Sequence, residues 1–332
     1  MLNPHLHLNQ KLFDEDVEKK ATRDGFGKGL VVLGEKDPNV VVLTADLNES
    51  TRCDEFAKKF PERFFDVGVA EQDMATIAAG MGVSGKCAFI SSYATFSPGR
   101  NWEPIRTTIV YNESNVKVAG HHAGVMTGPD GATHQATEDI ASVRAWPGMD
   151  VYVPCDAIES QKATIAAGEK YGPVYLRYTR DKTPLITTEE TPYTPGKIQT
   201  FWIAENPKAT IFATGYMLYY ALLAAKQLEG EGINVLVANV ATIKPMDEET
   251  LLELAKQTGA IVTVEDHQVM GGLGSAIAEV LARTLPTPQE FVGLQDTFAE
   301  SGKPLEILQK YHMDDKAIAE AVKKVIRRKS QS

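Results

Sequence analysis

Short runs of consecutive apolar residues alternate with longer helical patterns in the first half of the chain. The apolar runs are rich in β-branched and aromatic residues and have the length of strands; they cover residues 40–45, 64–69, 88–92, 116–120, 151–154 and 174–178. Because these runs are apolar throughout, we expect strands buried on both faces, as in a parallel sheet. Helical patterns lie between several of them, for example over 16–33 and 157–167.

The alternation stops over residues 182–197, a segment rich in Pro and Thr that we interpret as a linker. It then resumes, with strand-like runs at 209–214, 235–240, 261–265 and 291–294, and helical patterns at 218–228, 248–257, 273–283 and 315–326. We therefore predict an α/β fold of two three-layer domains with mainly parallel sheets. The predicted domains are residues 1–190 and 191–332.

The composition is that of a soluble globular protein: 43% of the 332 residues are hydrophobic and 23% are charged. No apolar run approaches the ~20 residues of a membrane span, and the first residues lack the apolar core of a signal peptide. The three cysteines are too scattered for a disulfide framework or a zinc site, so we expect a cytoplasmic protein. A net charge of −10 argues against nucleic acid as a partner, although a local cluster of basic side chains can still bind an anion.

One carboxylate stands at a position where α/β folds bind ligands. Residues 65–80 read FDVGVAEQDMATIAAG, so an apolar strand ends at Gly68, Glu71 follows, and a helix of small residues begins. This order places Glu71 at the carboxyl edge of a parallel sheet. Taken alone, Glu71 would be an ordinary acidic residue at a helix N-terminus.

Together with ADLNES at 45–50 and DGATHQ at 130–135, this segment resembles the pyrimidine-binding domain of transketolases. Residues 264–275, VEDHQVMGGLGS, resemble the C-terminal domain of the same family. The resemblance implies thiamine diphosphate as cofactor, with Glu71 as a catalytic residue that hydrogen-bonds the aminopyrimidine ring. A buried carboxyl can supply the proton that the reactive ring tautomer needs, since desolvation disfavours its charged form.

The segment that holds Mg²⁺ and the diphosphate in this family, Gly-Asp-Gly followed by an asparagine, does not occur in the sequence. We therefore expect no metal ligands in this chain. The resemblance implies a partner, an N-terminal transketolase subunit that supplies Mg²⁺ and the diphosphate site, with assembly into a heterotetramer.

The resemblance also implies further cofactor contacts. Residues 93–102, YATFSPGRNW, match the family's aromatic segment, so that Phe96 lies on the pyrimidine ring and Trp102 belongs to the same wall. Asp46 matches a position near the cofactor. Gly99 departs from the family, which often places a second Phe there.

The substrate-binding residues implied by the resemblance are Asp130 and His134 for hydroxyl and carbonyl groups, and Arg23, Ser50, His122 and Arg180 for phosphate. The spacing of the histidines fits no zinc pattern. His134 has a suitable side chain for proton transfer near neutral pH. Two guanidinium groups, an imidazole and a hydroxyl suit a phosphate through charge-assisted hydrogen bonds.

The sequence thus predicts the C-terminal subunit of a split transketolase, which moves a two-carbon ketol unit from a ketose phosphate to an aldose phosphate. One alternative is a 1-deoxyxylulose-5-phosphate synthase, but His122 and Gly99 argue against it. Another is the β subunit of a 2-oxo acid dehydrogenase, but the substrates of that enzyme carry no phosphate, so the predicted phosphate-binding residues would be unexplained. A non-catalytic regulatory homologue is the alternative from another class. Whether the pentose phosphate pathway or a specialised route uses the enzyme is left open.

Overall fold

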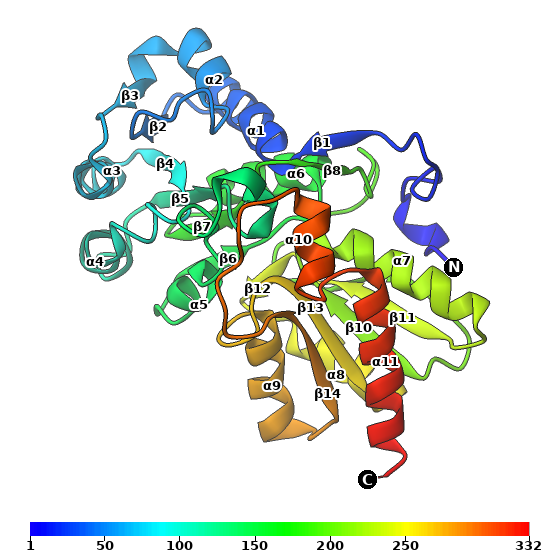
Figure 1. Ribbon diagram of the computed structural model, residues 1–332. Helices are drawn as coiled ribbons and strands as arrows, with labels where there is room; N and C mark the ends of the chain where they lie inside the picture. The colour runs from blue at the N-terminus through cyan, green and yellow to red at the C-terminus, as the bar shows by residue number, and fades with distance from the viewer. Residues whose placement is uncertain (332) are drawn as a thin grey trace.

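A seven-stranded sheet forms the centre of the first domain in the computed structural model, which describes residues 1–331 (Figure 1). Its strand order is β12-β6-β7-β5-β4-β2-β3. All neighbouring strands are parallel except β12, which is antiparallel to β6. The strands are β2 (Val40–Thr44), β3 (Phe64–Asp66), β4 (Cys87–Tyr93), β5 (Val116–His121), β6 (Asp150–Tyr152), β7 (Val174–Arg177) and β12 (Thr242–Lys244).

Helices cover both faces of this sheet, because successive residues of the buried strands point to opposite sides. In β2, Val40 and Val42 join the core under α1 and α6, whereas Val41 and Leu43 join the core under α3. The helices are α1 (Thr22–Lys36) and α6 (Ala157–Glu169) on one face, and α3 (Glu71–Val83), the π-helix η3 (Ile105–Val110) and α5 (Asp139–Arg144) on the other; α2 (Asp54–Lys59) and α4 (Trp102–Pro104) are shorter.

The second domain repeats this layered arrangement around five strands in the order β14-β13-β10-β11-β9. The strands are β9 (Gln199–Trp202), β10 (Ala209–Ala213), β11 (Val235–Asn239), β13 (Ile261–Gln268) and β14 (Gln289–Leu294). One face packs on α8 (Glu248–Thr258) and α9 (Leu273–Thr284), the other on α7 (Met217–Gly230), α10 (Pro304–Lys310) and α11 (Asp315–Lys329). The predicted α/β class with two layered, mainly parallel sheets is confirmed.

The helix predicted from residue 16 begins at Thr22, and the predicted linker is packed structure. Residues Lys19–Ala21 form a strand (β1) instead of the predicted helix, because they pair with Lys182–Pro184 (β8). β8 lies in the segment that we interpreted as a linker. Asp156 binds the linker further along: its carboxylate accepts hydrogen bonds from the backbone N–H groups of Ile186 and Thr187. Residues 182–197 therefore show no helical or strand periodicity because their backbone is irregular, although it is hydrogen-bonded to the first domain.

The two domains exchange segments. β12 belongs by sequence to the second domain but pairs with β6 of the first sheet. In the opposite direction, the first residues of the chain reach the second domain, where Leu8 and Leu12 join its core and the Phe13 ring packs 6.0 Å from that of Trp202. The division at residue 190 stays a prediction. No helix among residues 1–331 is long and apolar enough to cross a membrane.

Candidate active site

Most of the predicted site residues lie in loops or at helix starts that follow the parallel strands of the first sheet. Asp46 and Ser50 follow β2, Glu71 follows β3, and Phe96 follows β4. The rest are His122 after β5, Asp130 and His134 in the next loop, Arg180 after β7, and Arg23 in the first turn of α1. Since parallel strands end at one edge of a sheet, the fold gathers these loops at its carboxyl edge.

Glu71 is the first residue of α3 and its side chain is 1% exposed. One carboxylate oxygen lies 2.8 Å from Nη1 of Arg100, a half-exposed residue in the loop before α4. The backbone is held as well, since the Asn101 side chain donates to the carbonyl of Glu71 and to the hydroxyl of Ser97. A buried carboxylate thus stands at the edge of the sheet with one cation as its partner.

Aromatic rings form a wall next to Glu71. The Phe96 ring lies 5.9 Å from Tyr93 in a stacked arrangement and 5.6 Å from His134, edge to face. Trp102 instead packs against Trp146, with ring centroids 5.2 Å apart. Gly99 has no room for a side chain, because a Cβ there would lie 2.0 Å from the carbonyl oxygen of Thr95.

Basic side chains lie close to one another beside Tyr93. His122 is buried, stacks on Tyr93 at 3.9 Å, and its pKa is lowered to about 3 by burial and then by repulsion from Arg23, Arg180 and His134. Burial, followed by repulsion from Arg52, lowers the pKa of Arg23. These shifts show that the positive charges lie close enough to repel each other, so an anion placed among them would be stabilised.

Hydrogen bonds within the site fix this basic cluster. Arg23 Nη1 donates to the backbone carbonyl of Ser50 at 2.7 Å, and Arg180 Nη1 to that of Thr127 at 3.0 Å. Arg180 also lies 3.7 Å from Asp130. Within residues 1–331, Nε of Arg23 and Nδ1 of His122 are buried without a hydrogen-bond partner. Unpaired buried polar atoms are costly, so these two atoms are available to bind water or a polar ligand.

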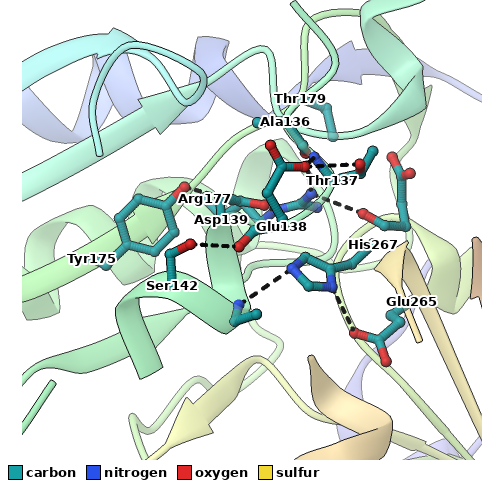
Figure 2. A network of polar contacts seen from close by, with 12 residues as sticks. Ala136, Thr137, Glu138, Asp139, Ser142, Tyr175, Arg177, Thr179, Glu265 and His267 are labelled. Carbon is teal, nitrogen blue, oxygen red and sulfur yellow. Dashed lines mark hydrogen bonds and ion pairs between the residues drawn. The ribbon is translucent and has the colours of Figure 1, made fainter. Parts of the chain in front are cut away.

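The second domain anchors the loop that carries His122, Asp130 and His134. The Arg177 guanidinium bonds Asp139 as well as the carbonyls of Ala136 and Asp266 (Figure 2). The Asp266 carboxylate accepts from the N–H of Val125, at the start of the 3₁₀ turn Val125–Asp130. His267 and Glu265 extend the same buried network, and Glu265 accepts the backbone N–H groups of Leu273 and Gly274 at the start of α9.

The fold and this site can now be compared with known proteins. The model of the transketolase pyrimidine-binding domain matches residues 18–185, and that of the transketolase C-terminal domain matches residues 200–318. This chain belongs to the transketolase family.

Several relatives of similar length are transketolase subunits or sections. A "putative transketolase C-terminal section" of Methanocaldococcus jannaschii is 43% identical over 306 residues, which cover 91% of this chain and 95% of the relative. A 6-deoxy-6-sulfo-D-fructose transketolase subunit of Clostridium sp. strain MSTE9 is 38% identical over 323 residues, covering 97% and 99%. One of the subunits of the apulose-4-phosphate transketolase of Phocaeicola vulgatus is 34% identical over 309 residues, covering 93% and 98%.

A solved structure described as "split gene transketolase, inactive beta4 tetramer" superposes with a TM-score of 0.86 at 45% identity and covers 92% of this chain and 98% of the other. Human transketolase, by contrast, is 33% identical over 311 residues that make up 93% of this chain but 49% of the human enzyme. The chain therefore corresponds to the C-terminal subunits of split transketolases.

Transketolases depend on thiamine diphosphate, and this site fits the pyrimidine half of that cofactor. Glu71 offers a buried carboxylate and Phe96 an aromatic face, whereas among residues 1–331 no cluster of three or more His, Cys, Asp or Glu side chains could hold a metal ion. Asp46 is exposed, with a positive φ of 59°, and its N–H donates to Asp66. The roles predicted for Asp46 and Trp102 stay predictions, as do those of the other site residues.

Three residues at this site were not expected from the sequence. Tyr93 is the first residue of the aromatic segment 93–102, Arg100 lies inside the same segment, and Arg52 follows Ser50 by two positions. The available signal was a place within a recognised motif for Tyr93 and Arg100, and a place close to one for Arg52. Their side-chain directions come from packing in three dimensions.

Proposed function

We propose that this chain is the half of a thiamine diphosphate-dependent transketolase that binds the pyrimidine ring and the substrate. A separate N-terminal subunit would supply Mg²⁺ and the diphosphate site, in a heterotetramer located in the cytoplasm. The reaction transfers a two-carbon ketol unit from a ketose to an aldose whose far end carries an anion. The observation that carries this proposal is the convergence of Arg23, His122 and Arg180 beside Glu71 and Phe96.

Each half of the site has a distinct task in this proposal. When bound, the cofactor supplies a nucleophilic carbon and stabilises the electron pair of the transferred unit. Glu71 holds the ring and provides its proton, Phe96 supports the ring face, and His134 with Asp130 binds the sugar near its reacting carbonyl. Arg23, Ser50, His122 and Arg180 bind the terminal anion and thereby orient the sugar.

The names of the relatives favour an anion at the sugar terminus without fixing its kind. One relative is named for a sulfo-fructose and another for a 4-phosphate of apulose. Sulfonate and phosphate share a tetrahedral group of oxygen acceptors that guanidinium groups bind well. We therefore propose a phosphorylated or sulfonated sugar as substrate.

An exposed apolar surface supports the presence of a partner chain. Large apolar side chains are exposed along one side of the first domain, at Phe65, Val69, Ile77, Val83, Trp102 and Tyr111. They belong to β3, α3 and α4 or to the segments that follow β3 and η3, and Val69 is two residues from Glu71. Clusters of exposed apolar side chains mark interaction sites, and a partner that docks here would close over the pyrimidine site. We name these six residues the α3 surface.

The proposal is tested by the substrate preference of Arg180→Ala in the enzyme assembled with its partner. Loss of a hydrogen bond to a charged group costs ~1.5–3 kcal/mol, so kcat/KM for ribose 5-phosphate should fall roughly ten- to a hundred-fold. Turnover of a short aldehyde without an anion should change far less. Arg283→Ala serves as control, because Arg283 lies in the last turn of α9 and pairs with Glu248. A sulfonated aldehyde assayed alongside separates the two anions.

If the ratio of kcat/KM between the phosphorylated and the neutral acceptor does not change in Arg180→Ala, the anion site is contradicted and the 2-oxo acid dehydrogenase alternative is favoured.

A second candidate activity is that of 1-deoxy-D-xylulose-5-phosphate synthase. The enzyme of that name from Caldanaerobacter subterraneus is 36% identical over 306 residues, 92% of this chain and 49% of that enzyme. Formation of deoxyxylulose phosphate and CO2 from pyruvate and glyceraldehyde 3-phosphate by the assembled enzyme would support this alternative.

A further inference from the structure

The ion pair between Glu71 and Arg100 places a cation inside the pyrimidine site. Arg100 comes from the loop before α4, and its Nη1 lies 2.8 Å from a carboxylate oxygen of Glu71. The Glu71 side chain is 1% exposed, whereas that of Arg100 is 49% exposed. The carboxylate is therefore fixed in the interior, and the arginine reaches it from solvent.

The same guanidinium also lies over an aromatic ring. Its carbon is 4.6 Å from the centroid of Phe96, a distance typical of cation–π contacts. Arg100 thus brings one planar group into contact with Phe96 and Glu71 together. These two residues are the ones that the proposed function assigns to the face and to the edge of the aminopyrimidine ring.

We propose that Arg100 is a placeholder for the cofactor: in the free chain its guanidinium occupies the pyrimidine subsite, and it leaves when the ring binds. This inference rests on the proposed function. The physical reason is that a buried carboxylate with no partner is costly, so a free chain lacking this pair would be destabilised. Because Arg100 is already half in solvent, its departure leaves little surface to desolvate. The Glu71 carboxylate, now without its cation, would take up a proton from solvent and donate it to the ring nitrogen, so that a hydrogen bond to the ring replaces the ion pair.

A placeholder has a measurable consequence for affinity. The ring must compete with Arg100, so the apparent dissociation constant of the cofactor is higher than it would be for an open subsite. Removing the guanidinium should therefore tighten cofactor binding. An arginine that binds the cofactor would give the opposite result.

The test measures thiamine diphosphate affinity by calorimetry on the enzyme assembled with its partner in the presence of Mg²⁺. Arg100→Met keeps an unbranched side chain but removes the charge, and it should lower the dissociation constant about tenfold or more. Arg106→Met is the matched control: Arg106 is an exposed arginine on the neighbouring η3, and its loss should leave the constant unchanged. If Arg100→Met does not assemble, Arg100→Ala should likewise tighten binding, because it also removes the group that pairs with Glu71 and covers Phe96.

Melting of the free chain gives a second readout that needs no activity. Arg100→Met should lower the melting temperature, and adding Glu71→Gln should recover most of the loss, since no buried charge then remains unpaired. An unchanged or higher dissociation constant in Arg100→Met would overturn the inference. If the assembled wild-type enzyme did not bind thiamine diphosphate at all, the proposed function itself would fail.

Discussion

At the scale of single residues, the site contains a few buried ionisable side chains whose neighbours differ in charge. Glu71 is buried with one cation, whereas His122 is buried among cations and has a pKa lowered to about 3. His122 therefore approaches the anion site as a neutral ring, and a bound anion favours its protonated form. The sequence motifs identified both residues. They did not reveal Arg100, because nothing in a linear motif shows that a side chain reaches back over the Phe96 ring.

Glu71→Gln should lower kcat of the assembled enzyme roughly 100-fold or more, since an amide cannot supply the proton that the ring needs. Cofactor affinity should change far less, because the diphosphate is expected to be bound by the partner. The measurement combines steady-state kinetics with hydrogen–deuterium exchange at C2 of the cofactor. Glu103→Gln, at an exposed position in α4, serves as control. Exchange in Glu71→Gln as fast as in the wild type would contradict the assigned role.

At the scale of helices and strands, apolar periodicity predicted the type and order of most elements. Buried runs such as Val40–Thr44 and Ala209–Ala213 became strands at almost the expected positions, because their burial depends on their own side chains. The start of α1 and the nature of residues 182–197 could not be predicted in this way. Both depend on contacts between distant segments, namely the pairing of β1 with β8 and the bonds that Asp156 makes to Ile186 and Thr187.

The first turn of α6 gives a pH-dependent stability. Glu159 is buried there and accepts hydrogen bonds from Asn239 Nδ2 at 2.8 Å and from the N–H of Cys155. Burial, and then repulsion from Asp156, raises its pKa from 4.5 to about 7. Between these values the folded chain holds a proton that the unfolded chain has released, so this contribution to stability falls as pH rises through the window.

Glu159→Gln should remove that dependence, which amounts to about 1.4 kcal/mol per pH unit for one proton. We expect the variant to gain stability relative to wild type as pH rises from about 5 to 8. The measurement is the free energy of unfolding in urea at several pH values. Glu169→Gln is the control, at the exposed end of the same helix, where Glu169 pairs with Lys36. A parallel pH profile in Glu159→Gln and wild type would contradict the prediction.

At the scale of the whole molecule, the chain joins a pyrimidine-binding domain to a C-terminal domain and presents an apolar side. The α3 surface lies on the face of the first sheet opposite to α1 and α6. The resemblance in sequence predicted a partner because a metal and diphosphate motif is missing. The binding place that we propose for that partner could not be predicted from the sequence, because exposure of Val69 or Ile77 depends on how the strands and helices pack.

Replacing Ile77 and Val83 by Asp should weaken binding of the N-terminal subunit about 30-fold or more at each position, since a charge would be buried in an apolar contact. Both side chains are exposed, so the free chain should keep its melting temperature. Val32→Asp is the matched control, an exposed apolar residue of α1. Binding is measured by sedimentation or calorimetry. If Ile77→Asp and Val83→Asp bind the subunit as tightly as wild type and Val32→Asp do, the partner binds elsewhere.

The crossing of β12 into the first sheet limits how this chain can move. A hinge between the domains would have to break the pairing of β12 with β6 and the buried bonds of Arg177 to Ala136 and Asp266. Both connections are buried, so we expect the two domains to move together. Under the proposed function, exchange of the cofactor would therefore depend on movement between this chain and its partner rather than on opening within this chain.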